Sequence, residues 1–268
     1  MQIDREQKVQ LENALTIALD ESEFELYYQP IIDLKNNSIV SAEVLIRWSH
    51  QEKLIPTDLF IPLAEESDLI LEIDRWVLKN ACEKAAIWFN QLGHKVSIHV
   101  NLSSKFFQRL ETPQVIEEVL NSTGLSGSLL CLEITETAVI SDAEVTKKNI
   151  LEIKKLGVLI ALDDFGTGFS SLNYLTQFSL DKIKIDRTFI SNLHKDKSNQ
   201  AVVDALIKLA NQLDIVVVAE GVEKIEHHNY LINAGCHFSQ GFFYSKPIML
   251  EEFINLYSNS KYVQVLNF

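Results

Sequence analysis

The sequence is poor in cysteine, and its few cysteines form no recognisable site. Cys82, Cys131 and Cys236 are odd in number and show no paired spacing. Cysteine-based zinc sites and disulfide frameworks need such pairs, so these cysteines indicate neither. This usage of cysteine favours a reducing compartment, and we expect the protein in the cytoplasm.

Long hydrophobic runs are also absent. No apolar segment approaches the roughly 20 residues that a membrane-spanning helix needs. Residues 1–6 have neither the charge nor the apolar stretch of a signal peptide. We expect a soluble chain, which can also be the cytoplasmic module of a membrane-bound protein.

Positive charge is scarce. The 268 residues include 24 lysines and arginines against 37 aspartates and glutamates, a net charge of −13. Such a chain repels a phosphate backbone, which argues against binding of a nucleic acid polymer. A small phosphorylated ligand is still compatible, because bound metal ions can reverse the local charge of an acidic site.

What is present is a globular composition, with 47% hydrophobic residues. Apolar residues at helical spacing predict an amphipathic helix over residues 5–20. We therefore divide the chain into a leader helix, 1–20, and a main domain, 21–268. Two runs joined by a polar turn, 24–32 and 39–48, predict a hairpin.

After the hairpin, strands and helices alternate. Buried parallel strands with crossover helices are typical of a closed barrel or an open doubly wound sheet. Two hairpin strands and six later ones make eight, which favours an α/β fold of the TIM-like (β/α)8 barrel type. The later strands are predicted at 96–100, 129–134, 158–162, 182–185, 215–219 and 236–239, and the helices at 69–92, 114–121, 143–156, 200–213 and 225–234.

Polar side chains occur in or just after each predicted strand from the second onward. The carboxyl ends of parallel strands point to one face of a barrel, where barrel enzymes assemble their active sites. We therefore expect a single candidate site there, formed by Glu43, Asn101, Glu133, Asp163, Asp164, Lys184, Glu220 and Gln240.

The carboxylates of this predicted site suggest bound cations. Crowded carboxylates repel one another unless cations neutralise them, and oxygen ligands suit Mg²⁺ or Mn²⁺ better than Zn²⁺. The adjacent Asp163 and Asp164 would let one carboxylate bridge two ions, as in two-metal phosphoryl chemistry. Any one of these acids could instead be a solvated surface group. The histidines that lack companion ligands are interpreted as structural or exposed: His99, His227 and His228.

The positions of the glycines support a site at the same face of the barrel. The chain has only nine glycines, and four lie within three residues of the proposed ligands: Gly166, Gly168, Gly221 and Gly241. Because glycine permits positive φ and close backbone approach, we predict that the segment 163–172 is a loop that closes over the metals. The alternative is a tight turn into a helix, with Ser170 or Ser171 as its N-cap.

Together these motifs closely resemble the EAL-domain family, the bacterial phosphodiesterases of cyclic di-GMP. The resemblance runs in order over residues 21–254, and the motifs that carry it are Tyr28-Gln29-Pro30-Ile31, Glu43-Val44-Leu45-Ile46-Arg47-Trp48, Asn101-Leu102-Ser103, Glu133-Ile134-Thr135-Glu136, the 163–172 segment, Lys184-Ile185-Asp186, Ala219-Glu220-Gly221-Val222-Glu223 and Gln240-Gly241.

The resemblance implies a barrel whose first strand is antiparallel and an enzyme that converts cyclic di-GMP to linear pGpG. It implies two divalent cations, Mg²⁺ or Mn²⁺. One would be held by Glu43, Asn101, Glu133 and Asp163, and the other, directly or through water, by Asp163, Asp164 and Glu220.

The resemblance also implies the remaining roles and partners. The catalytic residues would be Lys184, which orients the nucleophile, with Glu220 and Asp164. Substrate would contact Gln29, Leu45, Arg47 and Gln240, and Glu136 would anchor the 163–172 loop. A homodimer and an upstream sensory or regulatory domain are expected. The sequence departs from the family pattern at Val44, Asp68 and Ser179, none of them a ligand position.

Two alternatives differ in function class. The first is an inactive module that binds cyclic di-GMP as a receptor, although receptors of this kind usually lack ligand residues that are present here. The second is a barrel enzyme that abstracts a proton next to a carboxylate, in which both Lys182 and Lys184 would face inward. That alternative gives no role to Asp186 or to the 163–172 segment.

Overall fold

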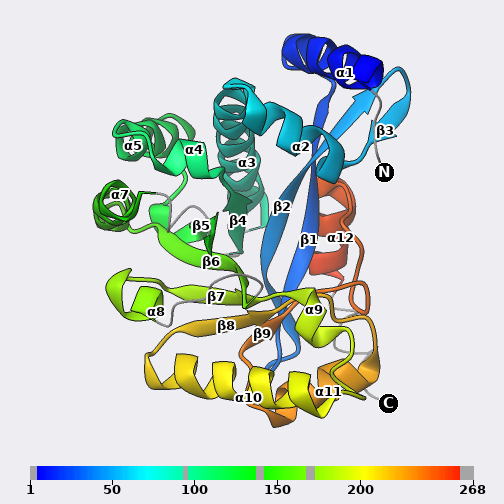
Figure 1. The fold of residues 1–268 in the computed structure, drawn as a ribbon, viewed down its shortest axis with the longest axis vertical. Coiled ribbons are helices and arrows are strands. Elements are labelled where there is room, and N and C mark those ends of the chain that lie inside the picture. The colour runs from blue at the N-terminus through cyan, green and yellow to red at the C-terminus, as the bar shows by residue number, and fades with distance from the viewer. Residues whose placement is uncertain (1–4, 93–95, 137–141, 167–172, 260–268) are drawn as a thin grey trace.

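Eight strands close into a barrel in the computed structural model, which describes residues 5–92, 96–136, 142–166 and 173–259. The barrel strands are β1 (Phe24–Asp33), β2 (Ser38–His50), β4 (Ser97–Asn101), β5 (Leu130–Thr135), β6 (Leu159–Phe165), β7 (Lys182–Ile185), β8 (Val216–Ala219) and β9 (Phe238–Ser239). They lie in the order β1-β9-β8-β7-β6-β5-β4-β2, and β1 pairs back onto β2, which closes the ring (Figure 1). The predicted barrel is confirmed.

The first strand runs against its neighbours. β1 is antiparallel to both β2 and β9, whereas the successive pairs from β2 and β4 to β8 and β9 are parallel. This confirms the antiparallel first strand. The hairpin register places Gln29 of β1 directly opposite Glu43 of β2. A short strand, β3 (Lys53–Ile55), continues from β2 outside the ring.

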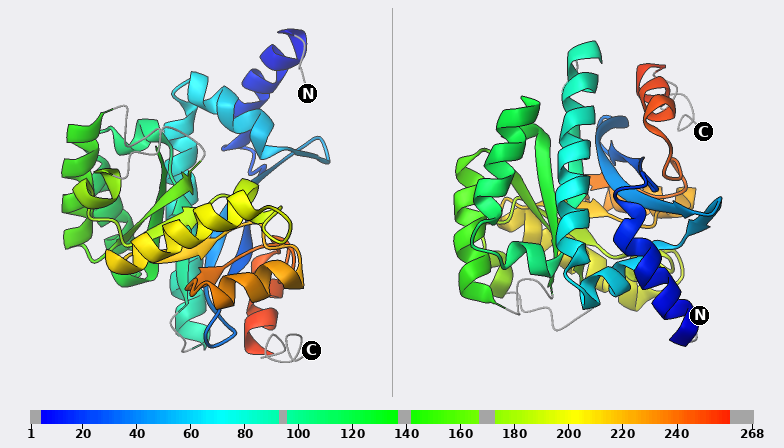
Figure 2. Two further views of the ribbon diagram at one scale, coloured as in Figure 1. Left: turned by 60° about the horizontal axis from the view of Figure 1, so that its bottom comes forward. Right: turned by 90° about the horizontal axis from the view of Figure 1, so that it is seen from above.

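Helices cover the outside of the barrel, as the two views in Figure 2 show. Besides the leader helix, five of them were predicted: α3 (Leu69–Leu92), α5 (Thr112–Thr123), α7 (Ala143–Lys155), α10 (Lys197–Gln212) and α11 (Ile225–Asn233). The elements that were not predicted are β3, α2 (Thr57–Glu66), α4 (Ser104–Phe107), the 3-10 helix η1 (Gly127–Leu129), α8 (Asn173–Gln177), α9 (Arg187–Ile190) and α12 (Leu250–Ser258).

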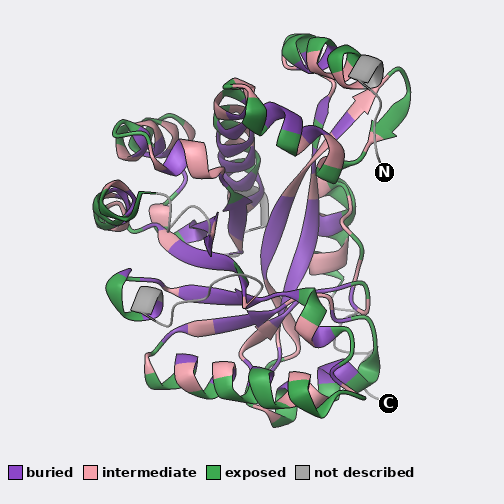
Figure 3. Ribbon diagram, in the orientation of Figure 1, coloured by how far each residue is buried: buried purple, intermediate pink, exposed green. Residues whose placement is uncertain are grey.

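The apolar core lies between the barrel and its helices. Figure 3 shows buried strands and helices whose outer faces are exposed. In α3 the buried positions Ile70, Ile73 and Val77 recur at intervals of three and four, the spacing that one helix face requires. At the end of β2, Trp48 packs edge-on against Phe60 of α2, with ring centroids 5.4 Å apart. This packing holds α2 beside the carboxyl end of β2.

The leader helix, α1 (Arg5–Ala18), packs onto the barrel through a narrow apolar stripe. Ala14, Leu15 and Ala18 are buried, and the Lys8 ammonium lies 2.6 Å from a carboxylate oxygen of Glu66 in α2. The predicted helix is confirmed, whereas the division of the chain at residue 20 stays a prediction. No helix within the described part of the chain combines the length and the hydrophobicity that crossing a bilayer requires.

Two glycines with almost the same backbone conformation provide a test of packing at the carboxyl face. Gly221 (φ 67) follows β8, and a Cβ there would lie 2.4 Å from the Arg187 Cβ. Gly124 (φ 70) ends α5, and a Cβ there would have no neighbour within 4 Å. We expect Gly124→Ala to lower the free energy of unfolding by roughly 1–2 kcal/mol through backbone strain alone.

Gly221→Ala should cost more, because overpacking adds about 1–3 kcal/mol to the same strain. Urea unfolding of the two variants and the parent protein measures the difference. An equal loss of unfolding free energy in the two variants would contradict the close approach of the segment after β8 to α9.

Candidate active site

The polar residues predicted from the strand ends lie together at the carboxyl ends of the parallel strands. Asn101 ends β4 and pairs in register with Glu133 of β5. The next pairing places Thr135 beside Asp163 of β6. The remaining members of the cluster come from β2, from β7 and from the segments that follow β8 and β9: Glu43, Lys184, Glu220 and Gln240.

The Lys184 ammonium lies at the centre of this acidic cluster. Its Nζ is 2.6 Å from Glu133 Oε2, 2.7 Å from Glu220 Oε1, 3.1 Å from Asp163 Oδ2 and 3.3 Å from Glu43 Oε1. Burial by itself lowers the pKa of a lysine, but the four carboxylates outweigh it, so the pKa of Lys184 is raised well above its usual value. The residue is only 1% exposed and is charged.

Asp163 and Asp164 both join the cluster although they are neighbours in the sequence. Successive strand residues normally point to opposite faces. The pairing of β6 with β7 is irregular between Leu162 and Phe165, and Asp164 has a φ of 55°. This bulge turns both carboxylates toward the cluster.

Two groups of three carboxylates result, and Asp163 belongs to both. Within each group, one oxygen from each residue lies within 4.8 Å of the others. Carboxylate oxygens at this separation can hold a hard divalent cation. The groups are Glu43 with Glu133 and Asp163, and Asp163 with Asp164 and Glu220.

Negative charge in the cluster exceeds the single positive charge of Lys184. Burial raises the pKa of Glu133 well above its usual value and that of Glu220 to about 8, because Lys184 offsets it only in part. Burial and the neighbouring Asp163 also raise the pKa of Asp164. Further cations would stabilise the ionised forms, so the charge of the cluster fits a metal site.

Two amides flank Glu43. Asn101 Nδ2 donates to Glu43 Oε1 at 2.7 Å, and Gln240 Nε2 donates to Glu43 Oε2 at 2.5 Å. Burial raises the pKa of Glu43, but the Lys184 ammonium and these hydrogen bonds outweigh it and lower the pKa overall. The other amide atom of Gln240, Oε1, is buried without a hydrogen-bond donor. A hydrated cation would supply such a donor, which is a second observation that fits a metal site.

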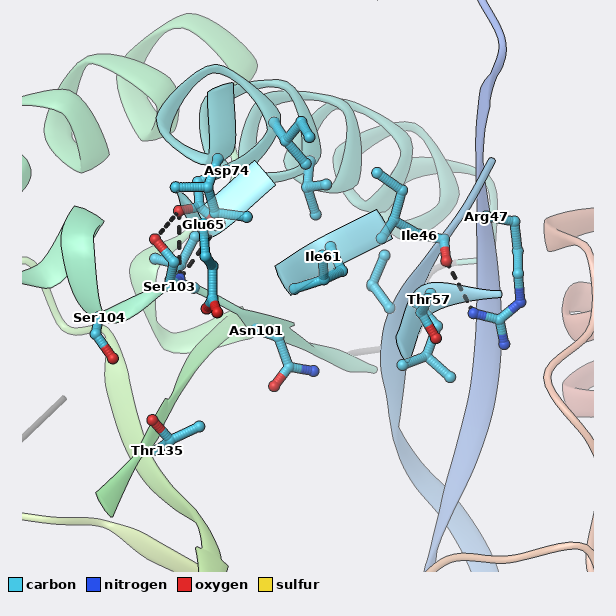
Figure 4. A pocket seen from close by; sticks show the side chains of 16 residues that line it. Ile46, Arg47, Thr57, Ile61, Glu65, Asp74, Asn101, Ser103, Ser104 and Thr135 are labelled. Atoms are coloured by element: carbon cyan, nitrogen blue, oxygen red, sulfur yellow. Dashed lines mark hydrogen bonds between the residues drawn. The ribbon is translucent and has the colours of Figure 1, made fainter. Parts of the chain in front are cut away.

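A cavity of about 300 Å³ opens beside Asn101, between β2 and the helices α2 and α3. Figure 4 shows the Asn101 side chain at its edge and Arg47 at the opposite side. Leu45 also lines the cavity. The Arg47 guanidinium donates to the Ile46 carbonyl at 2.8 Å and lies 5.5 Å above the centre of the Tyr27 ring. Two of the predicted substrate contacts, Leu45 and Arg47, therefore face one space.

The cavity holds a carboxyl group that the sequence analysis missed. Asp74 of α3 is 5% exposed and accepts a 2.5 Å hydrogen bond from the Ser103 hydroxyl (Figure 4). Burial raises the pKa of Asp74 to about 7. Asp74 lies in the middle of a helical pattern, away from any strand end, so the argument from strand ends could not find it.

The other two predicted residues, Gln29 and Glu136, each contact the backbone of another segment. Gln29 is buried, and its Nε2 donates to the Ser245 carbonyl at 3.1 Å. Glu136 is also buried, and its Oε1 accepts from the Gly166 backbone N–H at 3.1 Å. Most of the predicted loop, residues 167–172, lies outside the described residues. This part includes Gly168 and the proposed N-caps, Ser170 and Ser171.

The three histidines that sequence analysis set aside are all buried. His227 Nε2 lies 3.2 Å from His194 Nδ1, and His228 Nδ1 lies 2.8 Å from the Tyr244 hydroxyl. His99 lies in the barrel interior, where burial and nearby lysines hold its pKa well below the usual range, so the ring is neutral. Burial rules out the exposed alternative for all three, and their interpretation as structural residues stays a prediction.

Both Lys182 and Lys184 face inward, as the proton-abstraction alternative required. Lys182 does not join the carboxylate cluster. Its Nζ lies 2.8 Å from His99 Nε2, and no described carboxylate lies within 4.0 Å of it. Only one of the two lysines therefore reaches the candidate site.

Comparison with known proteins identifies the family. The family model of the EAL domain matches residues 12–247. The chain belongs to the EAL domain family. It is 36% identical over 247 residues to the signaling protein YkoW of Bacillus subtilis, which covers 92% of the chain and 31% of YkoW. It is 35% identical to the bifunctional diguanylate cyclase/cyclic di-GMP phosphodiesterase MucR of Pseudomonas aeruginosa, over 95% of the chain and 37% of MucR.

Solved EAL structures share the fold. The PaMucR phosphodiesterase in its c-di-GMP complex has a TM-score of 0.87 and 36% identity, over 91% of this chain and 99% of that one. The EAL enzyme Bd1971, bound to cAMP and cyclic di-GMP, has a TM-score of 0.90 and 34% identity, over 94% of this chain and 69% of that one. The chain spans only about a third of the length of the curated relatives YkoW and MucR.

The raised pKa of Glu220 predicts how the metal-free EAL domain responds to pH. A carboxyl whose pKa is raised in the folded state stabilises the fold at low pH, and this stability is lost as pH rises through the folded value. In chelated protein, the free energy of unfolding should fall by at least about 1 kcal/mol between pH 7 and pH 8.5.

Urea unfolding in EDTA measures this loss. Glu220→Gln should reduce the pH slope, whereas Glu117→Gln, a change on the exposed face of α5, should leave it unchanged. Excess Mn²⁺ should reduce the slope in the parent protein, and the part that remains belongs to groups outside the cluster, such as Asp74. Stability that is constant or rises over this pH range in EDTA would contradict the electrostatic account.

Proposed function

We propose that this protein is a metal-dependent phosphodiesterase that hydrolyses one phosphodiester bond of cyclic di-GMP and releases linear pGpG. The observation that carries the proposal is the pair of carboxylate groups that share Asp163 around the Lys184 ammonium. Membership of the EAL family and the similarity to MucR support the substrate and the reaction.

Two divalent cations, Mg²⁺ or Mn²⁺, would be held by the two carboxylate groups. Glu43, Asn101, Glu133 and Asp163 would hold one, and Asp163, Asp164 and Glu220 would hold the other, directly or through water. Asn101 would turn its amide oxygen inward for this purpose. When bound, such ions lower the pKa of water and neutralise charge on a reacting phosphate.

The chain's own residues would bind and orient the reactants. Lys184 has an ammonium fixed by four carboxylates, and it would donate to the attacking water or to a phosphate oxygen. Asp164 and Glu220 are more exposed than the other carboxylates of the cluster, and they would accept hydrogen bonds from that water. Arg47 offers a planar donor fork for the second phosphate.

The cavity beside Asn101 would take one guanine base. Its apolar wall includes Leu45, Ile61 and Ile70, which suit the face of a flat ring. Gln29 and Gln240 would contact the dinucleotide from the opposite side of the barrel mouth. An inactive receptor remains the alternative function, but no feature of the acidic cluster favours it over hydrolysis.

The setting of the protein belongs to the same proposal. The relatives are longer than this chain, which supports an upstream sensory or regulatory domain in the full-length protein. A homodimer and a cytoplasmic location remain predictions. The chain can also be the cytoplasmic module of a membrane-bound protein. Binding of a nucleic acid polymer is not expected.

Hydrolysis by purified protein tests the proposed function. With cyclic di-GMP and Mg²⁺ or Mn²⁺, we expect pGpG as the first product on chromatography. Glu43→Ala and Asp163→Ala should each lower kcat/KM at least about a hundredfold, because each removes a carboxylate from the cluster. Lys184→Met should lower kcat, because the ammonium that donates to the reactants is lost. It should not weaken Mn²⁺ binding, because the substitution removes a positive charge from a cation site. Substrate binding without turnover in the parent protein would instead support the receptor.

The contact between Glu136 and Gly166 predicts a distinct metal dependence. Without that acceptor, the segment after β6 loses its anchor and Asp164 loses its position, so Glu136→Ala should raise the Mg²⁺ concentration needed for half-maximal activity. Glu136→Gln keeps an acceptor oxygen and should stay close to the parent. Superimposable Mg²⁺ titrations for all three proteins would contradict the anchoring role.

A further inference from the structure

A second polar layer lies beneath the carboxylate cluster, inside the barrel. It consists of His99 of β4 and Lys182 of β7, which are 0% and 6% exposed. His99 Nδ1 is 2.7 Å from Glu133 Oε1, and His99 Nε2 is 2.8 Å from Lys182 Nζ. A continuous chain of contacts therefore runs from Lys182 through His99 and Glu133 to Lys184.

Lys182 fixes the direction of these hydrogen bonds. An ammonium only donates, so His99 Nε2 must accept from it, and the proton of the neutral ring must lie on Nδ1. Nδ1–H then donates to Glu133 Oε1. The other carboxylate oxygen, Oε2, is left facing Lys184 at 2.6 Å.

The hydrogen bond to His99 also explains how Lys182 can be buried. Lysine is rarely buried unless it is paired with a carboxylate. No described carboxylate lies within 4.0 Å of its Nζ, and the centre of the Phe238 ring is 5.8 Å away. His99 is therefore the hydrogen-bond acceptor that the structure gives this ammonium.

We propose that Lys182 and His99 are positioning residues that hold Glu133 with one oxygen turned into the site. Both oxygens of Glu133 are engaged, one by His99 and one by Lys184, so a rotation of the carboxylate breaks both contacts. Glu133 belongs to the group with Glu43 and Asp163, and its orientation sets the geometry of that group. The inference rests on the proposed function only in taking this group as a metal site.

Metal binding without substrate tests the inference. Calorimetric titration with Mn²⁺ is made on the parent protein and on His99→Leu, His99→Asn and Lys182→Met. His99→Leu removes the donor to Glu133 and should weaken binding about 10- to 100-fold, the range for partners that orient ligands. His99→Asn places an amide N–H near the position of Nδ1 and should recover most of the affinity.

Lys182→Met separates positioning from a merely structural role. The change removes a buried charge, so the melting temperature should not fall, yet Mn²⁺ affinity should drop several-fold because His99 Nε2 loses its hydrogen-bond donor and the ring is held by Glu133 alone. Unchanged affinity in both His99→Leu and Lys182→Met would overturn the inference. If His99→Leu or Lys182→Met does not fold, the Mn²⁺ affinity of the other variant and the His99 tautomer of the parent protein test the positioning role.

The tautomer is read by ¹⁵N NMR of protein labelled at its seven histidines, with His99→Asn giving the assignment. We expect His99 to carry its proton on Nδ1 in the parent, and we expect the Nε2 resonance to shift in Lys182→Met because that nitrogen loses its hydrogen-bond donor. A proton on Nε2 in the parent would overturn the inference. If Mn²⁺ binds as expected but cyclic di-GMP is not hydrolysed, the proposed function fails while this inference stands. A parent protein that binds no Mn²⁺ contradicts both.

Discussion

The pairing of the buried Lys184 ammonium with four carboxylates is the constraint on which the rest of the structure depends. An unpaired ammonium at this depth would be strongly destabilising, and so would the unpaired carboxylates. The four partners come from β2, β5, β6 and the segment after β8. They converge only when the barrel closes in the observed register, so the closed fold and the candidate site require the same arrangement of strands.

The positions of the acidic residues were predictable because strand ends in a parallel barrel share one face. Glu43, Glu133 and Glu220 needed only correct strand assignment. Asp164 was also predicted in the site, but the bulge and the positive φ in β6 that turn it there were not, since no glycine signals them. Asp74 was missed because a helical residue joins the cavity only through the packing of α3 on the barrel.

The fold shows the same division between periodic and irregular elements. The long helices and the barrel strands carry clear periodicity and were predicted. β3 was not, because its turn uses positive φ at Gln51 and Glu52, where glycine or asparagine would ordinarily mark a hairpin. Helices of four or five residues, such as α4 and α9, contain too few positions for a pattern, and α2 contains Pro62, which argues against a helix from sequence alone.

The role of His99 could not be inferred from sequence, because its partners are distant in the chain and are set by register and barrel closure. In register, Glu43 pairs with His99 and Asn101 pairs with Glu133, so β4 places His99 one layer below Asn101. Lys182 reaches the same layer because it precedes Lys184 by two residues on one face of β7. The period of two that brings Lys184 to the carboxylates therefore also brings Lys182 to His99. A barrel interior that is polar in both layers can keep Glu133 oriented without help from loops, since His99, Lys182, Glu133 and Lys184 all lie on strands.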